Sequence, residues 1–368
     1  MFGVVPKPIW ERTNPADSNN RIEMCSRSLL IEDGNRLILI DTGMGNKQSE
    51  KFFSHYDRWG NDNLDQSLRQ KGFHRNDVTD VFFTHLHFDH CGDGVIKNSR
   101  GILEPSFKNA LFWSHEDHWQ WATQPNLRER ASFLPENILP IQESGQLKLL
   151  KGADFMMKNT PLGFDIILVN GHTEKQMLPV LKYRDRTLVF AADLIPTVGH
   201  LPIPYVMGYD TRPLISMEEK NQFLKMACKE NFLLFLEHDP FNEMISLQET
   251  EKGVRMNEKH NLASFFLMKK LFYILMFPLL ISCGGIKFVG NPTLTTLTQF
   301  NKKQSLVEEE EKYWHLMDLS QDSIPGMSVD RAYQELIKDQ KGEEVIVAVI
   351  DSGVDIEHSQ LLSSVWVN

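Results

Sequence analysis

The sequence is poor in cysteine. It has 4 in 368 residues, and they lie far apart, at Cys25, Cys91, Cys228 and Cys283. Proteins that depend on a disulfide framework carry many more cysteines in a shorter chain, so this class is excluded. The first residues do not have the pattern of a secretory signal, so we expect none at this end. We therefore expect the first part of the protein to occupy a reduced, cytoplasmic environment.

Positive charge is also scarce. Lysine and arginine number 39 against 49 aspartate and glutamate residues, which gives a net charge of −10 and an isoelectric point near 5.7. Binding of nucleic acid needs a concentrated basic surface, so no nucleic-acid partner is expected. The composition, 41% hydrophobic and 24% charged, is that of a globular protein, and the length allows two domains. A small-molecule substrate fits these properties better.

The densest group of chemically active residues lies at residues 85–90. It reads His-Leu-His-Phe-Asp-His and follows residues 81–84, an apolar run typical of a buried strand. Neutral imidazole and carboxylate are ligands that suit zinc and similar divalent ions. Burying three histidines without partners would be costly, so the pattern predicts a metal site in the turn that leaves a strand. Further ligands must come from elsewhere in the chain.

The pattern His-x-His-x-Asp-His resembles the signature of the metallo-β-lactamase superfamily. The resemblance implies an α+β fold, a four-layer αββα sandwich, for residues 1–255. It also implies three later ligands in a fixed order, and the residues that fit are His172 in Gly171-His172-Thr173, Asp193 and His238. Each follows an apolar run, at residues 166–169, 188–192 and 233–236 respectively. Functional residues of such folds gather at strand ends, which agrees with the assignment.

The resemblance further implies a binuclear centre with two divalent ions, zinc being the expected metal. The ligands of the first ion would be His85, His87 and His172. Those of the second would be Asp89, His90 and His238, and Asp193 would bridge the two. A hydroxide between the ions would attack the substrate, with Asp89 and Asp193 as catalytic carboxylates. Asp41, after the predicted strand 36–40, matches a family aspartate that orients ligand histidines, or else closes a turn.

Residues 1–7 and the ligand spacing resemble the lactonase-like and organophosphate-hydrolase-like branch of the superfamily. This implies hydrolysis of a small ester or lactone, such as an acyl-homoserine lactone, and relatives of this kind are often homodimers. Hydrolysis of organophosphates or aryl esters is the alternative. Many members continue Gly-His-Thr with Pro-Gly-His, whereas Glu174-Lys175-Gln176 follow here, so no single subfamily's substrate transfers directly.

Some residues have both a functional and a structural interpretation. Tyr209 and His200 lie in the proline-rich loop 194–213, where each could contact substrate, protonate a leaving group or only pack. Cys91 follows the metal motif and is expected to be a small buried thiol rather than a ligand. His115 and His118 form a second closely spaced pair, which we assign to an exposed helix start and not to metal binding.

Helix boundaries follow from capping patterns. Ser114 with Asp117, and Ser216 with Glu219, are predicted capping boxes. Leucines at helical spacing predict a short helix within residues 63–70. Pro135 and Pro140 are expected to break any long element in residues 128–151, an insertion beside the active site.

The chain changes character after residue 255. Lys269 and Lys270 precede the apolar residues 271–281, a run too short to span a bilayer but similar to a secretory signal. Leu280-Ile281-Ser282-Cys283 resembles the lipobox of bacterial lipoproteins, so we expect residues 256–290 to be a linker in which residues 268–283 associate with a membrane. A buried core helix is the alternative interpretation.

Residues 291–368 resemble the start of a subtilisin-like serine protease, a partial α/β fragment. Asp351, after the apolar residues 345–350, matches the aspartate of the protease triad. The partner histidine and serine are absent, so no protease activity is expected. Our hypothesis for these features is a chimeric reading frame, in which we expect the hydrolase to lack its first strand. An inactive fusion product without an assembled metal site is the alternative of another class.

Overall fold

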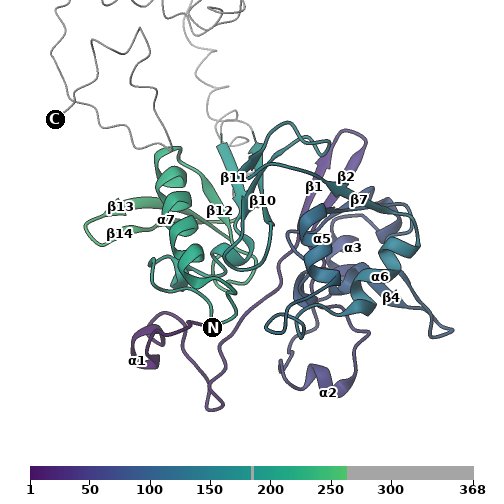
Figure 1. Ribbon diagram of the computed structural model, residues 1–368, viewed down its shortest axis with the longest axis horizontal. Coiled ribbons are helices and arrows are strands. Elements are labelled where there is room, and N and C mark those ends of the chain that lie inside the picture. The colour runs from purple at the N-terminus through teal and green to yellow at the C-terminus, as the bar shows by residue number, and fades with distance from the viewer. Residues whose placement is uncertain (184–185, 263–368) are drawn as a thin grey trace, which may run out of the picture. The chain divides into compact units, whose positions relative to one another are not determined.

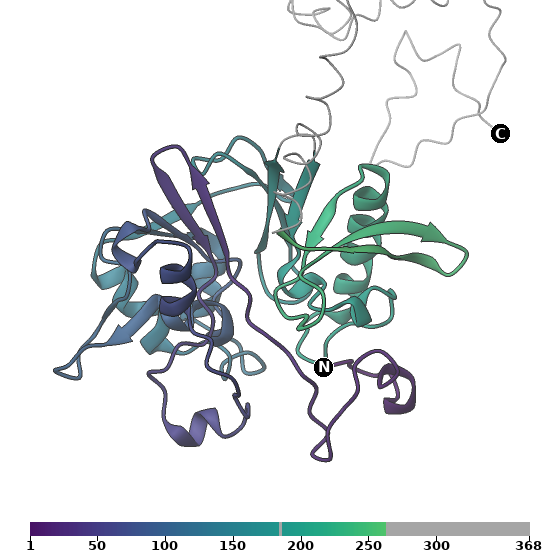
Figure 2. The same cartoon turned by 180° about the vertical axis from the view of Figure 1, so that it is seen from behind.

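The computed structural model describes residues 1–183 and 186–262 (Figures 1 and 2). The chain divides into two units, Met1–Cys283 and Gly284–Asn368, and only the first contains described residues. The predictions for Cys283, for Asp351 and for membrane association of residues 268–283 therefore fall outside the described residues. Among the helices that are described, none has the length and apolar character needed to cross a bilayer.

The first sheet has five strands in the order β1-β2-β3-β6-β7. These strands are β1 Leu29–Asp33, β2 Arg36–Ile40, β3 Asp80–Phe82, β6 Leu111–His115 and β7 Leu147–Leu150. β1 and β2 form an antiparallel hairpin whose turn contains Gly34 in the left-handed region, at φ +60°. The other strands run parallel to β2. The carboxyl ends of β2 and β3 therefore lie together, and Asp41 and the metal motif follow them.

The second sheet has the order β14-β13-β12-β11-β10-β9-β8. Its strands are β8 Met156–Met157, β9 Asp165–Val169, β10 Gln176–Tyr183, β11 Arg186–Phe190, β12 Leu233–Phe235, β13 Met244–Thr250 and β14 Gly253–His260. Only β11 and β12 pair in parallel, and helix α7, Pro213–Lys229, lies between them in the sequence. β14 ends at His260, so the sheet continues past the predicted domain end at residue 255.

The remaining elements are short. The helices are α1 Lys7–Trp10, α2 Glu50–Phe53, α3 Leu64–Gln70, α4 Phe88–Cys91, α5 Glu116–Thr123 and α6 Pro135–Glu143, and a small hairpin pairs β4 Val95–Lys97 with β5 Leu103–Pro105. The predicted helix within residues 63–70 is confirmed, and the Asn63 side chain caps it by accepting from Gln66 N. Pro140 lies inside α6 instead of ending it.

Two hydrophobic clusters define the layers. Side chains alternate along β2, so Ile38 and Ile40 join a cluster with the second sheet, whereas Leu37 and Leu39 face a cluster that contains residues of α3, α5 and α6. The ring of Phe82 on β3 contacts Phe164, just before β9, at 5.6 Å between centroids. Helix α7 adds Phe223 and Ala227 to the first cluster. The predicted α+β, four-layer αββα arrangement is confirmed.

Two capping predictions were wrong. α5 begins after His115, whose Nδ1 accepts from Asp117 N at 3.2 Å, while Ser114 is buried at the end of β6. His115 and His118 are not at an exposed helix start, because both are fully buried. Short-range sequence pattern does not reveal this burial, which comes from packing against residues far away in the chain.

The second error concerns α7. It begins at Pro213 after Arg212, and Ser216 is buried within its first turns. Glu219 instead accepts hydrogen bonds from Asn170 N at 2.7 Å and Gly171 N at 2.9 Å, so it holds the turn that leads to His172. A Cβ on Gly171 would come within 2.3 Å of Ser216 N, which explains why glycine precedes His172. Ser216 and Glu219 match the capping-box pattern, but in the structure they serve tertiary packing.

Candidate metal centre

Four strand ends converge at the site. The motif 85–90 follows β3 of the first sheet, whereas His172 follows β9, Asp193 follows β11 and His238 follows β12 of the second sheet. Each strand ends in buried residues, so its end is held firmly by the core. The centre is thus assembled from both sheets, and it requires their correct packing.

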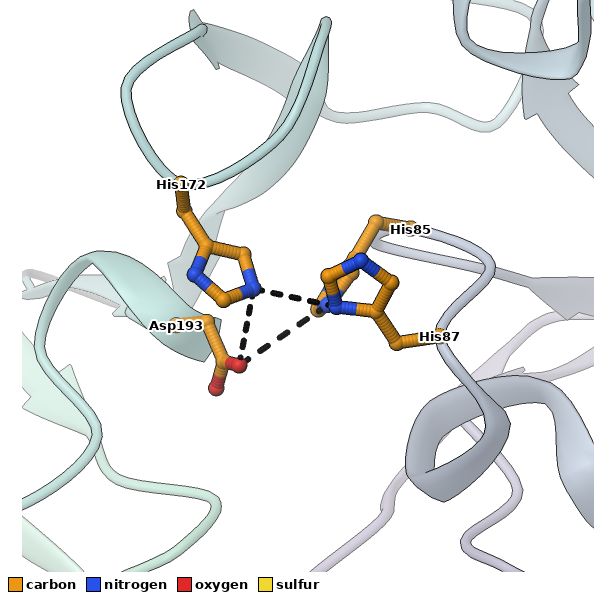
Figure 3. A group of neighbouring side chains, drawn as sticks. All are labelled: His85, His87, His172 and Asp193. Atoms are coloured by element: carbon orange, nitrogen blue, oxygen red, sulfur yellow. Dashed lines mark hydrogen bonds and ion pairs between the residues drawn. The ribbon is translucent and has the colours of Figure 1, made fainter. Parts of the chain in front are cut away.

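The first group consists of His85, His87, His172 and Asp193 (Figure 3). All four residues are buried. His87 Nδ1 lies 3.1 Å from His85 Nε2 and 3.1 Å from His172 Nε2. Asp193 Oδ2 lies 3.1 Å from His172 Nε2 and 3.8 Å from His85 Nε2. The ligand atoms therefore point toward one common point.

The second group consists of Asp89, His90 and His238. His90 Nε2 and His238 Nε2 are 3.2 Å apart, and each lies 3.9 Å from a carboxylate oxygen of Asp89. Asp193 reaches this group as well, because its Oδ1 lies 3.0 Å from His238 Nε2. Its Oδ2 also lies 3.6 Å from His90 Nε2, so the two groups share this carboxylate.

These separations fit bound divalent ions. Two ligand atoms on one tetrahedral zinc ion, each about 2.0–2.1 Å from the metal, stand about 3.3 Å apart. The contacts described above range from 3.0 to 3.9 Å, and all ligand atoms of a group lie within 4.8 Å of one another. Imidazole nitrogens and carboxylate oxygens are also the donors that zinc and neighbouring metals take. Both the donor set and the spacing are those of a metal centre with two adjacent positions.

The outer nitrogen of each ligand histidine has its own partner. Three of these partners are carboxylates: Glu129 lies 3.3 Å from His87 Nε2, Asp41 lies 3.0 Å from His90 Nδ1, and Asp210 lies 2.9 Å from His172 Nδ1. The other two are Thr84 Oγ1, 3.1 Å from His85 Nδ1, and Cys25 O, 2.7 Å from His238 Nδ1. Such partners fix ring orientation and tautomer, so all five rings are held with the other nitrogen directed inward.

Asp41 occupies the position expected from sequence. Its Oδ1 accepts from Thr84 N at 2.8 Å and its Oδ2 accepts from Thr84 Oγ1 at 2.6 Å, so one carboxylate connects β2 to the metal motif. The backbone of Asp41 is left-handed, at φ +54°. For a residue other than glycine this conformation is uncommon and indicates a strained, functional turn.

Three partners were not foreseen from sequence: Glu129, Asp210 and Glu237. Glu237 is fully buried, and its Oε2 lies 3.0 Å from His90 Nδ1, beside Asp41. Burial raises the pKa of Glu237 to about 7, although His90 opposes this. Glu237 could have been found in the sequence, because it is a charged residue directly after an apolar run. Glu129 and Asp210 lie in loops, and nothing local in the sequence distinguishes them from ordinary surface acids.

Electrostatics at the centre favour an anionic Asp193. Burial opposes its ionisation, but His238, His90 and His172 outweigh burial and hold the pKa of Asp193 well below its usual range. Burial likewise disfavours charge on His172, whereas Asp193 and Asp210 raise its pKa to about 10. Without a cation, the histidines must carry the positive charge that this carboxylate requires.

The other candidate residues lie outside both groups. Cys91 is buried, its thiol donates to Leu86 O, and burial raises its pKa to about 12. His200 is buried against the ring of Phe2, with centroids 4.2 Å apart, so it does not face substrate. Tyr209 is 62% exposed and borders a cavity of about 3310 Å³ that opens over the metal residues. Of the two loop candidates, only Tyr209 is placed to contact a ligand.

A family model described as the metallo-beta-lactamase superfamily matches residues 26–238, more than half of the chain. The chain belongs to the metallo-beta-lactamase superfamily. The match includes every residue of the two groups and ends at His238. A search of the curated proteins found no match. Membership in this superfamily and the two His/Asp groups together support hydrolase activity that depends on divalent metal.

Solved structures share the metallo-beta-lactamase fold. A probable metal-dependent hydrolase from Staphylococcus aureus is 24% identical, with a TM-score of 0.62 over 71% of this chain and 92% of that chain. AidC, described as a dizinc quorum-quenching lactonase, is 23% identical with a TM-score of 0.54, covering 66% and 82%. The hydrolase AbOPH is 21% identical with a TM-score of 0.55, covering 71% and 89%. At these identities the similarity shows the fold alone.

Proposed function

We propose that this metallo-beta-lactamase domain is a binuclear hydrolase that opens a small lactone or ester, with an acyl-homoserine-lactone-like compound as the expected substrate and zinc as the expected metal. One observation supports two metal positions above all. The Asp193 carboxylate directs Oδ2 to His172 and Oδ1 to His238, at 3.1 and 3.0 Å. A carboxylate divided in this way suits a bridge between two ions.

The chain's own residues explain how such a centre would work. Bound ions would supply an activated water at neutral pH and polarise the bond under attack. Asp193 and the outer partners hold the ligands in place, so little reorganisation is needed during reaction. Asp89 is the most exposed ligand, with 25% of its side chain accessible, against 7% for Asp193. Substrate therefore approaches from the side of Asp89, and the buried histidines lie behind it.

The cavity over the centre suits a substrate with an apolar part. Its lining includes Tyr56, Phe88, Met207, Tyr209 and Phe241. Phe88 stands between two ligands, and its ring contacts that of Tyr56 at 5.1 Å between centroids. Aromatic rings bind apolar and aryl groups well. This lining favours an acyl or aryl ester as substrate over a small, fully polar molecule.

The test uses the full chain. Metal content is measured by elemental analysis, and hydrolysis of an acyl-homoserine lactone and of an aryl ester is followed with added zinc, manganese or iron. We expect close to two ions per chain and lactone turnover. The Asp193→Ala variant should lose this turnover, whereas Asp154→Ala, at an exposed position, should keep it. A folded, metal-loaded protein that hydrolyses neither substrate would contradict the proposal, and turnover of the aryl ester alone would favour the alternative function.

A further inference from the structure

Arg128 connects the two halves of the site. It lies on the loop between α5 and α6, beside the first sheet, and its Nη2 donates to Gly208 O at 2.7 Å and Asp210 O at 3.0 Å. Those carbonyls belong to the loop between β11 and α7 of the second sheet. The guanidinium is thereby fixed at a place where the two sheets both approach the metal centre.

The position of Arg128 is tied to two ligands of the first group. Its neighbour Glu129 bonds to His87, and Asp210, whose carbonyl it contacts, bonds to His172. Arg128 also borders the same cavity as His87, His172 and Asp193, and its side chain is exposed there. A molecule that reaches the first group therefore comes close to a fixed cation.

Most of the hydrogen-bonding capacity of Arg128 is unused. A guanidinium carries five N–H donors, and only Nη2 has acceptors within the described residues. No carboxylate pairs with it in the described part of the chain, unlike the cavity-lining Arg21 and Arg75, which pair with Asp17 and Asp65. Arg128 thus offers Nε and Nη1 to a ligand from a preorganised position.

We propose that Arg128 is a specificity-determining residue that binds an acceptor oxygen of the substrate outside the bond that is cleaved, such as an amide carbonyl. This inference rests on the proposed function and narrows its substrate class. A lactone or ester with an adjacent amide would be preferred over one without it. A guanidinium that only ties the loop at 208–210 would instead affect all substrates equally, because it would act through Asp210 and His172.

Two matched substrates separate these roles: an N-acyl-homoserine lactone and a plain γ-lactone of similar chain length that lacks the amide. In Arg128→Met, kcat/KM for the amide-bearing lactone should fall by about 10-fold or more, as expected for loss of a hydrogen bond to a charged group. The plain lactone should change by less than about 3-fold. Arg128→Lys should recover part of the preference. Arg130→Met, at an exposed position two residues away, is the matched control and should leave both rates unchanged.

An equal loss on both lactones would overturn the inference and assign Arg128 to loop positioning. An unchanged preference in Arg128→Met would overturn it as well. If the full chain hydrolyses neither lactone, the proposed function fails, and calorimetry with the same two compounds then tests Arg128 alone. Tighter binding of the amide-bearing compound that Arg128→Met abolishes would support the inference, whereas equal affinities in the unmodified protein would contradict it.

Discussion

Two sets of closely spaced histidines stand in similar sequence contexts but have different chemistry. His85 and His87 follow β3, whereas His115 ends β6, the neighbouring strand of the same sheet, and His118 follows it. All four are buried, with acidic residues close by in the sequence. The difference lies in what their ring nitrogens contact. Burial and spacing alone therefore do not define a metal ligand.

In the second set both ring nitrogens are occupied by the backbone. His118 Nε2 accepts from Leu86 N at 2.8 Å, and its Nδ1 bonds to Glu174 O. His115 Nδ1 accepts from Asp117 N, and its Nε2 bonds to Gly152 O at 3.0 Å. No lone pair is left for an ion. In His85 and His87, one ring nitrogen instead points toward other potential ligands. Of these four histidines, only His85 and His87 can therefore bind metal.

The largest difference between the two sets is expected when one histidine is removed from each. His87→Ala should abolish turnover and the bound metal of the first group, because one of its four ligands disappears. His115→Ala should retain metal content and kcat/KM within about 3-fold and should lower stability alone, since only backbone partners are lost. Elemental analysis and lactone turnover would be measured for both variants. Retention of both ions in His87→Ala would refute the assignment.

Sequence alone was sufficient for the strands that lead into the site, because hydrophobic runs and strand ends are local properties. It also provided Asp41, since the aspartate stands directly after β2. Glu129 and Asp210 could not be predicted, because their contacts with His87 and His172 span 42 and 38 residues. The same limit explains the errors at Ser114 and Ser216. Their hydroxyls match a local capping pattern, yet long-range packing determines the helix start.

The next test leaves the ligand His87 in place and changes only its outer partner, Glu129. Glu129→Gln replaces the carboxylate behind His87 by a neutral amide of the same shape. Loss of such an outer partner typically costs 10–100-fold in metal affinity or activity, so a decrease in this range is expected. Competition with a chelator measures the affinity. Glu143→Gln, an exposed position on α6, is the control, and an unchanged affinity in Glu129→Gln would remove this partner from the site.

A smaller effect on metal affinity is expected from a change in the second set, His115 and His118. His118→Leu leaves the buried Leu86 N and Glu174 O without their shared partner, which costs about 1–3 kcal/mol per unsatisfied group. Urea unfolding in the presence of EDTA should show this loss of stability. Metal affinity should fall less than in Glu129→Gln, because His118 contacts the motif through Leu86 N and the edge of the His85 ring and not through the outer nitrogen of a ligand. A larger loss of metal than in Glu129→Gln would show that the two sets are less distinct than the contacts indicate.

The smallest expected effect is on the pH dependence of stability, and it comes from another buried histidine, His200, which belongs to neither set. Burial, together with Lys220, lowers the pKa of His200 to about 3, whereas an unfolded histidine titrates near 6.5. The unfolded chain therefore binds the extra proton between pH 6.5 and 3, so this stability is present above pH 6.5 and is lost as the pH falls below it. At pH 5.5 the cost is about 1.4 kcal/mol. His200→Gln cannot take up this proton. Its unfolding free energy, measured in EDTA so that metal release does not contribute, should fall less between pH 7.5 and 5.5 than that of the unmodified chain, and equal slopes would show that His200 is protonated in the folded protein.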